Sequence, residues 1–331
     1  MKVKDIGEQG LLRILQKFCP AEIVGDDCAV MATNPNQSLA ITTDMLVDGV
    51  HFSDRTTGPY YAGWRAAAAN LSDLAAMGAK PLAVTVALAV AADTAVEWVE
   101  EFYRGMTACL QEYDTPIVGG DVVRSPVVTV AITAFGEVEC DRTIRRSNAR
   151  SGWVIVATGV HGASRAGLEL LLNPEFGQNL EKVDRASLIL AHQRPKPRLD
   201  VLPVVWEILD SAGEFSIAGM DSSDGLADAI IQICRASGVG AKVDRTKLPI
   251  PDIFSEIVST EKSLDWALYG GEDFELVLFL PMANAELLVE KIGNGAAIVG
   301  IATDSSDIWL TDSSGIYPDA ILKLDRGFQH F

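Results

Sequence analysis

Histidine, cysteine and positive charge are all scarce in this sequence. It contains 4 histidines and 5 cysteines among 331 residues, and no two cysteines form a C-x-x-C pair. A disulfide framework and a zinc site are therefore not expected, and the cysteine pattern fits a reducing compartment. The formal net charge of −18 argues against nucleic acid or an anionic membrane as a partner, because both attract positive surfaces.

Signals for secretion and membrane insertion are also missing. The first residues carry no apolar stretch of the kind that opens a secretory signal. The longest apolar run, residues 81–92, is too short to span a bilayer. We therefore expect a cytoplasmic protein without a membrane partner.

The common nucleotide and hydrolase motifs are absent as well. The sequence has no G-x-x-x-x-G-K-[ST] loop, no protein-kinase signature, no G-x-G-x-x-G after a strand, and no H-E-x-x-H or G-x-S-x-G motif. If the protein uses a nucleotide, it does so without a P-loop, protein-kinase or Rossmann site.

Apolar periodicity predicts strands and helices that alternate along the chain, and hence an α/β (α+β) fold of mixed sheets flanked by helices. The length of 331 residues favours two domains. The arginine- and serine-rich segment 141–152 gives a boundary between residues 1–145 and residues 146–331. The expected strands occupy residues 38–43, 82–90, 127–135, 153–158, 241–243 and 275–280, and the expected helices occupy residues 5–18, 61–77, 93–113, 166–172, 199–211, 226–236 and 284–291.

A subset of carboxylates lies at the ends of apolar strands, beside glycine or inside an apolar helix. The members are Asp26, Asp27, Asp44, Asp73, Asp121, Asp221, Asp224, Glu272 and Asp273. Their motifs contain no lysine, so the sequence offers them no obvious cation partner. Bound divalent metal ions would relieve the repulsion and would let an acidic protein hold a polyphosphate.

Two segments are the clearest candidates for metal ligands. Thr42, Thr43 and Asp44 end the expected strand 38–43 and present hydroxyl and carboxylate oxygens together, which Mg²⁺ prefers. A turn that begins at Asp44 is the alternative. Asp73 lies in the expected helix 61–77, which has no charged face there and should be buried. A metal or ligand would compensate this carboxylate, and a structural hydrogen bond or buried ion pair is the alternative.

Three motifs rich in glycine or serine give weaker signals. Gly119-Gly120-Asp121 follows a short apolar strand, where the glycines would let the backbone approach a ligand and Asp121 bind a metal that bridges phosphates, and a plain turn is the alternative. Asp221-Ser222-Ser223-Asp224-Gly225 precedes the helix 226–236, where phosphate binding and ordinary N-capping use the same geometry. Gly270-Gly271-Glu272-Asp273 precedes the strand 275–280 and fits either a site or a capped turn.

Taken in order, these motifs resemble those of the thiamine-monophosphate kinase family. Residues 48–52 (DGVHF) and 70–78 (NLSDLAAMG) are its most specific parts. The other motifs are shared with a wider superfamily that includes aminoimidazole-ribonucleotide synthetase and selenophosphate synthetase. The segments that carry the resemblance span nearly the whole chain and are residues 25–30, 42–52, 70–79, 119–121, 221–226 and 270–276.

The resemblance implies an aminoimidazole-ribonucleotide synthetase-like fold with two domains. The N-terminal domain would bind ATP and magnesium and form a homodimer, and the C-terminal domain would complete the active site. The implied reaction is ATP-dependent phosphorylation of thiamine monophosphate to thiamine diphosphate. We expect direct in-line transfer without a catalytic general base, because the acceptor phosphate is already ionised near neutral pH.

The resemblance also implies a role for particular residues. Several Mg²⁺ ions would be bound by Asp27, Thr42, Thr43, Asp44, Asp73, Asp121, Asp221 and Asp224. ATP would contact Tyr103, Gly120, Asp121, Arg146 and Ser223. The thiamine substrate would contact His51, Glu272 and Phe328. For Arg146, which lies in a cluster of arginines, an interdomain salt bridge is the alternative.

The sequence departs from the family pattern at two positions, and two other functions compete. Ser222 stands where an apolar residue is expected, and Phe328 replaces a tryptophan or tyrosine. Another ATP-dependent enzyme of the superfamily is the nearest alternative, although Cys19 and Lys17, which selenophosphate synthetase would need as reactive residues, lie in an apolar helix. The other alternative function is that of a non-catalytic acidic metal-binding protein, although no EF-hand loop is present.

Overall fold

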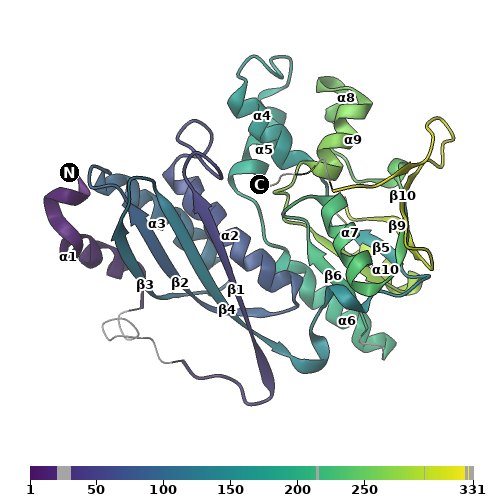
Figure 1. Cartoon of the computed structure of the whole chain (residues 1–331), viewed down its shortest axis with the longest axis horizontal. Helices are drawn as coiled ribbons and strands as arrows, with labels where there is room; N and C mark the ends of the chain where they lie inside the picture. The colour runs from purple at the N-terminus through teal and green to yellow at the C-terminus, as the bar shows by residue number, and fades with distance from the viewer. Residues whose placement is uncertain (21–30, 214–215, 294, 325–326, 328–331) are drawn as a thin grey trace. The chain divides into compact units, whose positions relative to one another are not determined.

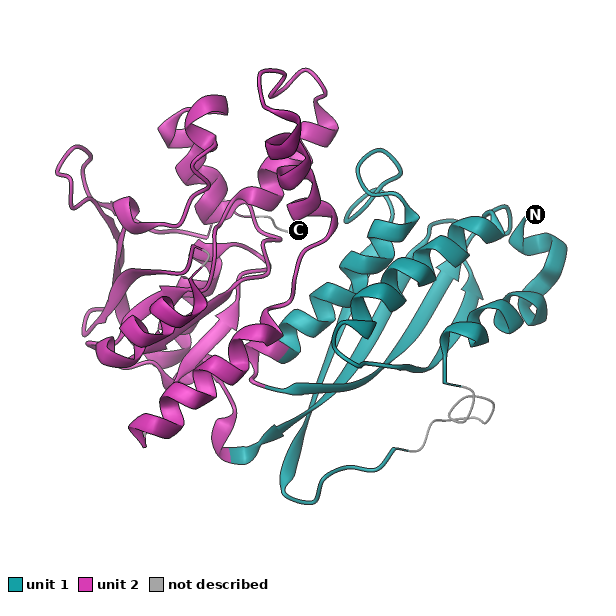
Figure 2. Cartoon of the chain, turned by 180° about the vertical axis from the view of Figure 1, so that it is seen from behind, with its two compact units in different colours: residues 1–74, 79–140 teal, residues 75–78, 141–331 magenta. Residues whose placement is uncertain are grey.

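The chain divides into two compact units (Figure 2). The computed structural model describes residues 1–20, 31–213, 216–293, 295–324 and 327. Unit 1 comprises Met1–Leu74 and Ala79–Cys140, and unit 2 comprises Ala75–Gly78 and Asp141–Phe331. The predicted boundary after residue 145 therefore falls inside unit 2.

Unit 1 is built on a four-stranded sheet with the strand order β1-β4-β2-β3. β4 is antiparallel to both β1 and β2, and β2 is parallel to β3. β1 and β3 are consequently the two opposite edges of this sheet. The elements are α1 (Val3–Leu15), the 3-10 helix η1 (Gln16–Phe18), β1 (Gln37–Val47), α2 (Pro59–Ala76), β2 (Lys80–Val90), α3 (Val96–Gln111), β3 (Ile117–Arg124) and β4 (Thr129–Glu139).

Helices α2 and α3 cover one face of this sheet (Figure 1). Two glycines let them approach. A Cβ added to Gly63 would lie 1.9 Å from the carbonyl oxygen of Phe102, and one added to Gly105 would lie 1.7 Å from that of Tyr60. Neither position leaves room for any larger residue, so glycine at both places sets the distance between the helices.

The other face of the sheet carries exposed apolar side chains. Leu39, Ile41 and Met45 alternate along β1 and are 49%, 59% and 55% exposed, and Val123 of β3 is 53% exposed. We call these residues the apolar face of unit 1. Exposed apolar patches of this kind mark surfaces that contact other molecules.

Unit 2 is built on a seven-stranded mixed sheet with the strand order β11-β10-β7-β9-β5-β8-β6. Its strands are β5 (Val154–Ala157), β6 (Ala218–Asp221), β7 (Gly240–Asp244), β8 (Leu276–Leu280), β9 (Ala297–Thr303), β10 (Ile308–Thr311) and β11 (Ala320–Ile321). Helix α7 packs on one face and helices α6 and α10 on the other, so the central strands β5 and β8 are buried on both faces. Burial on both faces explains why these strands are continuous apolar runs.

The helices of unit 2 fall into two groups. α6 (Leu202–Ala212), α7 (Leu226–Ser237) and α10 (Met282–Ile292) cover the sheet. A separate apolar cluster joins α4 (Ala163–Leu172), α5 (Lys182–Gln193), α8 (Phe254–Ile257) and α9 (Thr260–Tyr269). Short 3-10 helices are η2 (Cys140–Arg142), η3 (Arg146–Asn148), η4 (Arg198–Val201) and η5 (Arg245–Lys247).

The predicted mixed α/β architecture is confirmed, and two local expectations are wrong. The strand that begins near Ser38 continues to Val47, so Asp44 lies inside β1 rather than at its end. The glycines before Asp121 do not form a loop, because they lie within β3 and pair with β2. Backbone pairing to a neighbouring strand outweighs the weak strand propensity of glycine at this place.

Candidate functional site

The predicted ligands of unit 1 come together where β1 passes over α2. Thr42 and Asp44 lie two residues apart on β1 and so point to the same face. Thr42 Oγ1 donates a hydrogen bond to Asp73 Oδ2, and the Asp44 backbone N–H donates to Asn70 Oδ1 at 3.3 Å. We call Thr42, Asp44 and Asp73 the β1–α2 cluster.

The β1–α2 cluster presents one hydroxyl and two carboxylates, the oxygen ligands that suit Mg²⁺. The hydrogen bond from Thr42 shows that Asp73 has the structural partner considered as an alternative, whereas its metal role stays a prediction. Within the part of the chain that the structure describes, no three His, Cys, Asp or Glu side chains are grouped closely enough to hold a metal ion.

Asp121 lies apart from this cluster. The register aligns Asp121 with Ala87 of β2, Ala87 with Ala131 of β4, and Ala131 with Met45 of β1. Three strand spacings of about 4.8 Å each, or about 14 Å, thus separate the rows of Asp121 and Met45. Asp121 shares the apolar face with Met45, whereas Asp44 points to the α2 face. One chain does not bring Asp121 and Asp44 to one ion.

Thr43 lies on the apolar face, where its hydroxyl is 2.5 Å from that of Thr133. Thr43 and Asp121 thus share a face of the sheet and occupy its two opposite edges.

The other predicted residues of unit 1 have visible structural roles. A Cβ on Gly120 would lie 2.1 Å from the carbonyl oxygen of Val86, so glycine is needed for β3 to pair with β2. Tyr103 is 4% exposed with its ring centroid 5.5 Å from that of Phe18, and burial raises the pKa of its hydroxyl. His51 Nδ1 accepts a hydrogen bond of 3.1 Å from the backbone N–H of the last residue of β1. Their contacts with ATP and substrate stay predictions.

Three loops of unit 2 meet at one end of its central strands. β5 and β6 end there, and the antiparallel strand β8 begins there. We call residues 158–162 the β5 loop, residues 222–225 the β6 loop and residues 270–275 the β8 loop.

The predicted unit 2 residues lie at the junction of the β6 and β8 loops. The backbone N–H of Glu272 donates to the carbonyl of Ser223 at 2.7 Å. The hydroxyl of Ser223 donates to Asp221 Oδ1 at 3.1 Å. Asp221 is 3% exposed at the end of β6, while Asp224 is exposed directly before α7. Asp221, Ser223 and Glu272 are thus neighbours.

His161 of the β5 loop is a residue that the sequence analysis did not single out. It is fully buried, with Nδ1 at 3.0 Å from the carbonyl oxygen of Gly159 and Nε2 at 3.0 Å from Ser222 Oγ. The Gly159 carbonyl can only accept, so Nδ1 donates to it, and in the neutral ring Nε2 then accepts from the Ser222 hydroxyl. Burial lowers the pKa of His161 to about 4, against a smaller opposing effect of the Gly159 carbonyl. Ser222, unexpected as a polar residue, thus satisfies a buried imidazole.

A partly buried ion pair lies at the same end of the sheet. Arg198 Nη1 donates to Glu275 Oε2 and to the carbonyl of Thr158, the latter at 3.0 Å. Thr158 Oγ1 also donates to Glu275 Oε2 at 2.6 Å. Burial raises the pKa of Glu275 despite the opposing charge of Arg198. The partners are 77 residues apart, so no local pattern indicates the pair.

Arg146 has a different partner from the salt bridge considered above. It is exposed in η3, and its Nη1 donates to Gln232 Oε1 of α7 at 2.8 Å. The observed partner is therefore a neutral side chain of the same unit. Asp27 and Phe328 lie outside the described residues, so their predicted roles stay untested.

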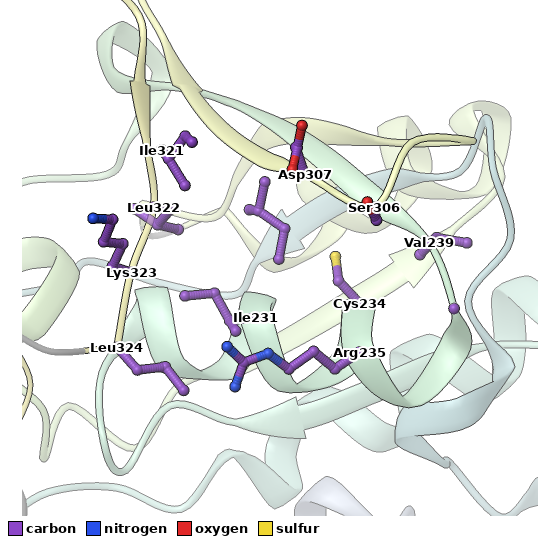
Figure 3. Close-up of a pocket in the computed structure, with 12 residues that line it drawn as sticks. Ile231, Cys234, Arg235, Val239, Ser306, Asp307, Ile321, Leu322, Lys323 and Leu324 are labelled. Carbon is purple, nitrogen blue, oxygen red and sulfur yellow. The ribbon is translucent and has the colours of Figure 1, made fainter.

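A cavity of about 640 Å³ in unit 2 contains none of the predicted ligands (Figure 3). It lies beside the C-terminal part of α7, and its lining includes Cys234, Arg235, Lys323 and Leu324. Burial raises the pKa of Cys234 to about 12, so its thiol is protonated and unreactive. We assign this cavity no part in the site. No helix among the described residues is long and apolar enough to cross a membrane.

Comparison with known proteins shows which family has this sequence and fold. Residues 25–138 match the model of the AIR synthase related protein, N-terminal domain. The chain is 49% identical to the thiamine-monophosphate kinase of Synechococcus elongatus over 329 residues, which cover 99% of this chain and 98% of the relative.

Solved structures agree with the sequence relatives. The crystal structure of thiamine-monophosphate kinase from Stenotrophomonas maltophilia is similar with a TM-score of 0.76 and 31% identity, covering 87% of this chain and 89% of the other. A structure of AaThiL complexed with AMPPCP and TMP has a TM-score of 0.72 and 29% identity, covering 97% of this chain and 98% of the other. Sequence motifs, fold and full-length identity coincide, and the chain belongs to the thiamine-monophosphate kinase family.

Proposed function

We propose that this protein transfers the γ-phosphoryl group of ATP to thiamine monophosphate, which yields thiamine diphosphate and ADP. The observation that carries the proposal is the 49% identity to the Synechococcus elongatus kinase across 99% of this chain. The similarity to AaThiL complexed with AMPPCP and TMP supports both substrates.

The transfer is direct and in line. An oxygen of the acceptor phosphate attacks the γ-phosphorus, the bond from that phosphorus to the β–γ bridging oxygen breaks, and ADP leaves with the electron pair. The acceptor oxygen is already ionised near neutral pH, so the protein needs no general base. Its task is to neutralise charge and align two anions. A phosphoenzyme trapped during turnover would contradict this mechanism.

Magnesium fits the oxygen ligands of both units. Bound Mg²⁺ would neutralise the phosphates and the charge that develops in the transition state. The residues proposed to hold the ions are Asp27, Thr42, Thr43, Asp44, Asp73, Asp121, Asp221 and Asp224. The β1–α2 cluster supports this assignment, because the Thr42 hydroxyl contacts the Asp73 carboxylate and both are hard oxygen ligands.

ATP and substrate contacts complete the proposal. ATP is assigned Tyr103, Gly120, Asp121, Arg146 and Ser223, and thiamine monophosphate is assigned His51, Glu272 and Phe328. Arg146 gives a direct test, since a guanidinium binds phosphate in a bidentate manner that lysine does not copy. Arg146→Lys should weaken ATP binding, and unchanged ATP affinity would leave Arg146 only its contact with Gln232.

We also propose a homodimer formed through unit 1. The apolar face supplies the exposed apolar area, and β1 and β3 supply two sheet edges. A two-fold arrangement that sets β3 of one copy beside β1 of the other places the partner subunit's Asp121 next to Thr43. This arrangement would unite ligands that a single sheet keeps at opposite edges.

Mixing two inactive variants tests the shared site. In a mixed dimer of Asp44→Asn and Asp121→Asn chains, one site carries both substitutions and the other carries neither. If the ligands come from different chains, mixing after mild dissociation restores activity. If both ligands come from one chain, every site keeps a substitution and the mixture stays inactive.

The function itself is tested by product analysis. The purified protein is incubated with Mg²⁺, ATP and thiamine monophosphate, and the products are separated and identified. Thiamine diphosphate and ADP in equal amounts are expected. ATP consumption with no thiamine diphosphate would favour another reaction of the superfamily, and metal binding without ATP consumption would favour a non-catalytic protein.

A further inference from the structure

The β8 loop holds a strained backbone around Asp273. Glu272 has a φ of 59° and Phe274 has a φ of 53°, in the left-handed region that residues with a Cβ rarely adopt. Elsewhere in the described ranges only Asp114 among non-glycine residues has a positive φ. Strain of this kind persists only where surrounding contacts hold the backbone in place.

Asp273, which lies between the two strained residues, makes such contacts. Its Oδ2 accepts a hydrogen bond from the Gly162 N–H at 2.7 Å, and its Oδ1 accepts one from the Ser164 N–H at 2.9 Å. These N–H groups belong to the N-terminus of α4, whose own N-cap residue, Gly162, makes no side-chain cap. A carboxylate 109 residues along the chain from Ser164 therefore caps this helix.

Glu272 contacts the β6 loop through its backbone and a neighbour of the α4 N-terminus through its side chain. Its backbone N–H donates to the carbonyl of Ser223 at 2.7 Å. Its Oε2 lies 3.7 Å from His192 Nδ1, which in turn lies 3.2 Å from Ser164 Oγ. Ser164 therefore makes two of these contacts. Its backbone N–H donates to Asp273, and its hydroxyl lies beside His192. The N-terminus of α4 locates both the loop backbone and a neighbour of the Glu272 carboxylate.

We propose that Asp273 is a positioning residue for substrate recognition. By binding the N-terminus of α4, it holds Glu272 in the left-handed conformation from which the Glu272 carboxylate meets the substrate. The role rests on the proposed function, in which Glu272 contacts thiamine monophosphate. Asp273 itself acts through Glu272 and touches no reacting atom.

Asp273→Asn is the test variant, because an amide nitrogen then faces an N–H group that needs an acceptor. Asp312→Asn is the matched control. Asp312 also accepts backbone N–H groups in unit 2, from Ser314, Ile316 and Tyr317 at 3.0, 2.9 and 2.6 Å. Asp273→Asn should raise the KM for thiamine monophosphate about 10-fold or more, the effect of one lost contact, and change kcat and the KM for ATP less than about 2-fold. Asp312→Asn should change none of them.

A double variant shows whether Asp273 acts through Glu272. In a Glu272→Gln background, Asp273→Asn should add little to the KM, because the group that it positions is already gone. Equal KM increases in both backgrounds would overturn the proposal. So would a lower melting temperature with an unchanged KM, which would make Asp273 a helix cap only.

Hydrogen exchange separates this proposal from the proposed function, because it needs no turnover. Amides of residues 159–165 and 270–276 should exchange faster in Asp273→Asn and at the wild-type rate in Asp312→Asn. Faster exchange in Asp273→Asn, found together with a wild type that cannot phosphorylate thiamine monophosphate, would sink the proposed function and leave the loop restraint intact. An active wild type with unchanged exchange and KM in the variant would sink the positioning role.

Discussion

Acidification should destabilise this protein through His161. The folded structure favours the neutral ring, because the site is fully buried, and in this form Nε2 accepts from the Ser222 hydroxyl. The pKa is depressed from an ordinary value of 6.5 to about 4. A group with a depressed folded pKa gives its full contribution above its unfolded pKa and loses it as the pH falls through the folded value. The affected window therefore runs from pH 6.5 down to about pH 4.

The size of the effect follows from the shift. One pKa unit corresponds to about 1.4 kcal/mol, so this histidine should cost about 2 kcal/mol of stability at pH 5 and about 3 kcal/mol at pH 4. Asp273 has the opposite effect on the pH dependence of stability. Burial raises its pKa to about 7, so its contribution to the free energy of unfolding is lost as the pH rises towards that value. The net pH dependence of the wild type thus mixes both groups, and a variant is needed to isolate His161.

His161→Gln isolates the histidine. Glutamine keeps an oxygen that accepts from Ser222 but does not titrate. Urea denaturation of both proteins at pH 5, 6, 7 and 8, with chelator present to exclude metal effects, gives the difference in the free energy of unfolding at each pH. The wild type should lose about 2 kcal/mol relative to the variant between pH 7 and pH 5.

A parallel pH dependence of wild type and variant would refute this reasoning. If the variant folds too poorly for denaturation, the imidazole resonances of the wild type provide the answer. A His161 signal that titrates near pH 6.5 would show that the ring is not held neutral by burial.

Three further predictions concern the site and the core. Asp73→Asn should lower kcat at least about 100-fold with little change in melting temperature, because a metal that stabilises transition-state charge contributes several kcal/mol; near-normal turnover across a Mg²⁺ titration would remove Asp73 from the metal site. Gly105→Ala should destabilise unit 1 by about 1–3 kcal/mol through its clash with Tyr60, whereas Gly58→Ala, with nothing within 4 Å of the added Cβ, should stay within about 0.5 kcal/mol in the same urea assay. Phe328→Ala should raise the KM for thiamine monophosphate about 3–30-fold by removing an aromatic contact to the thiazolium, and a large loss of thermal stability with a normal KM would assign the ring to the core.

Long periodic elements could be predicted from the sequence, and short or closely paired ones could not. Helix α2 and strand β2 follow their apolar patterns almost to the residue, since burial of one face dictates the spacing. β6 spans only Ala218–Asp221, and such a strand is too short to show a period. The extension of β1 to Val47 depends on its pairing with β4, and no local signal carries that long-range contact.

The sequence singled out residues that the fold brings together but not how they assemble, and their binding roles stay predictions. Asp73 stands out in the sequence because a carboxylate is unusual in an apolar helix. Its contact with Thr42 depends on β1 crossing α2 in the folded structure. The separation of Asp121 from Asp44 depends on strand order and on which face each residue occupies, and neither is encoded locally. His161 gave no signal, because its partner Ser222 is 61 residues away.

The carboxylates singled out in the sequence differ in their hydrogen-bond partners, and these partners indicate different roles. Both oxygens of Asp273 accept backbone N–H groups, and neighbouring Glu275 accepts from a guanidinium and a hydroxyl. Carboxylates satisfied in this way by protein donors hold loops in place, and adding a metal would require breaking those bonds. In the β1–α2 cluster Asp73 accepts from the Thr42 hydroxyl, and Asp44 lies two residues from Thr42 on the same face of β1. A divalent cation would stabilise such a grouping of oxygen ligands. If the β1–α2 cluster binds Mg²⁺ as proposed, removing the ion should therefore loosen this cluster and leave the β8 loop bound to α4.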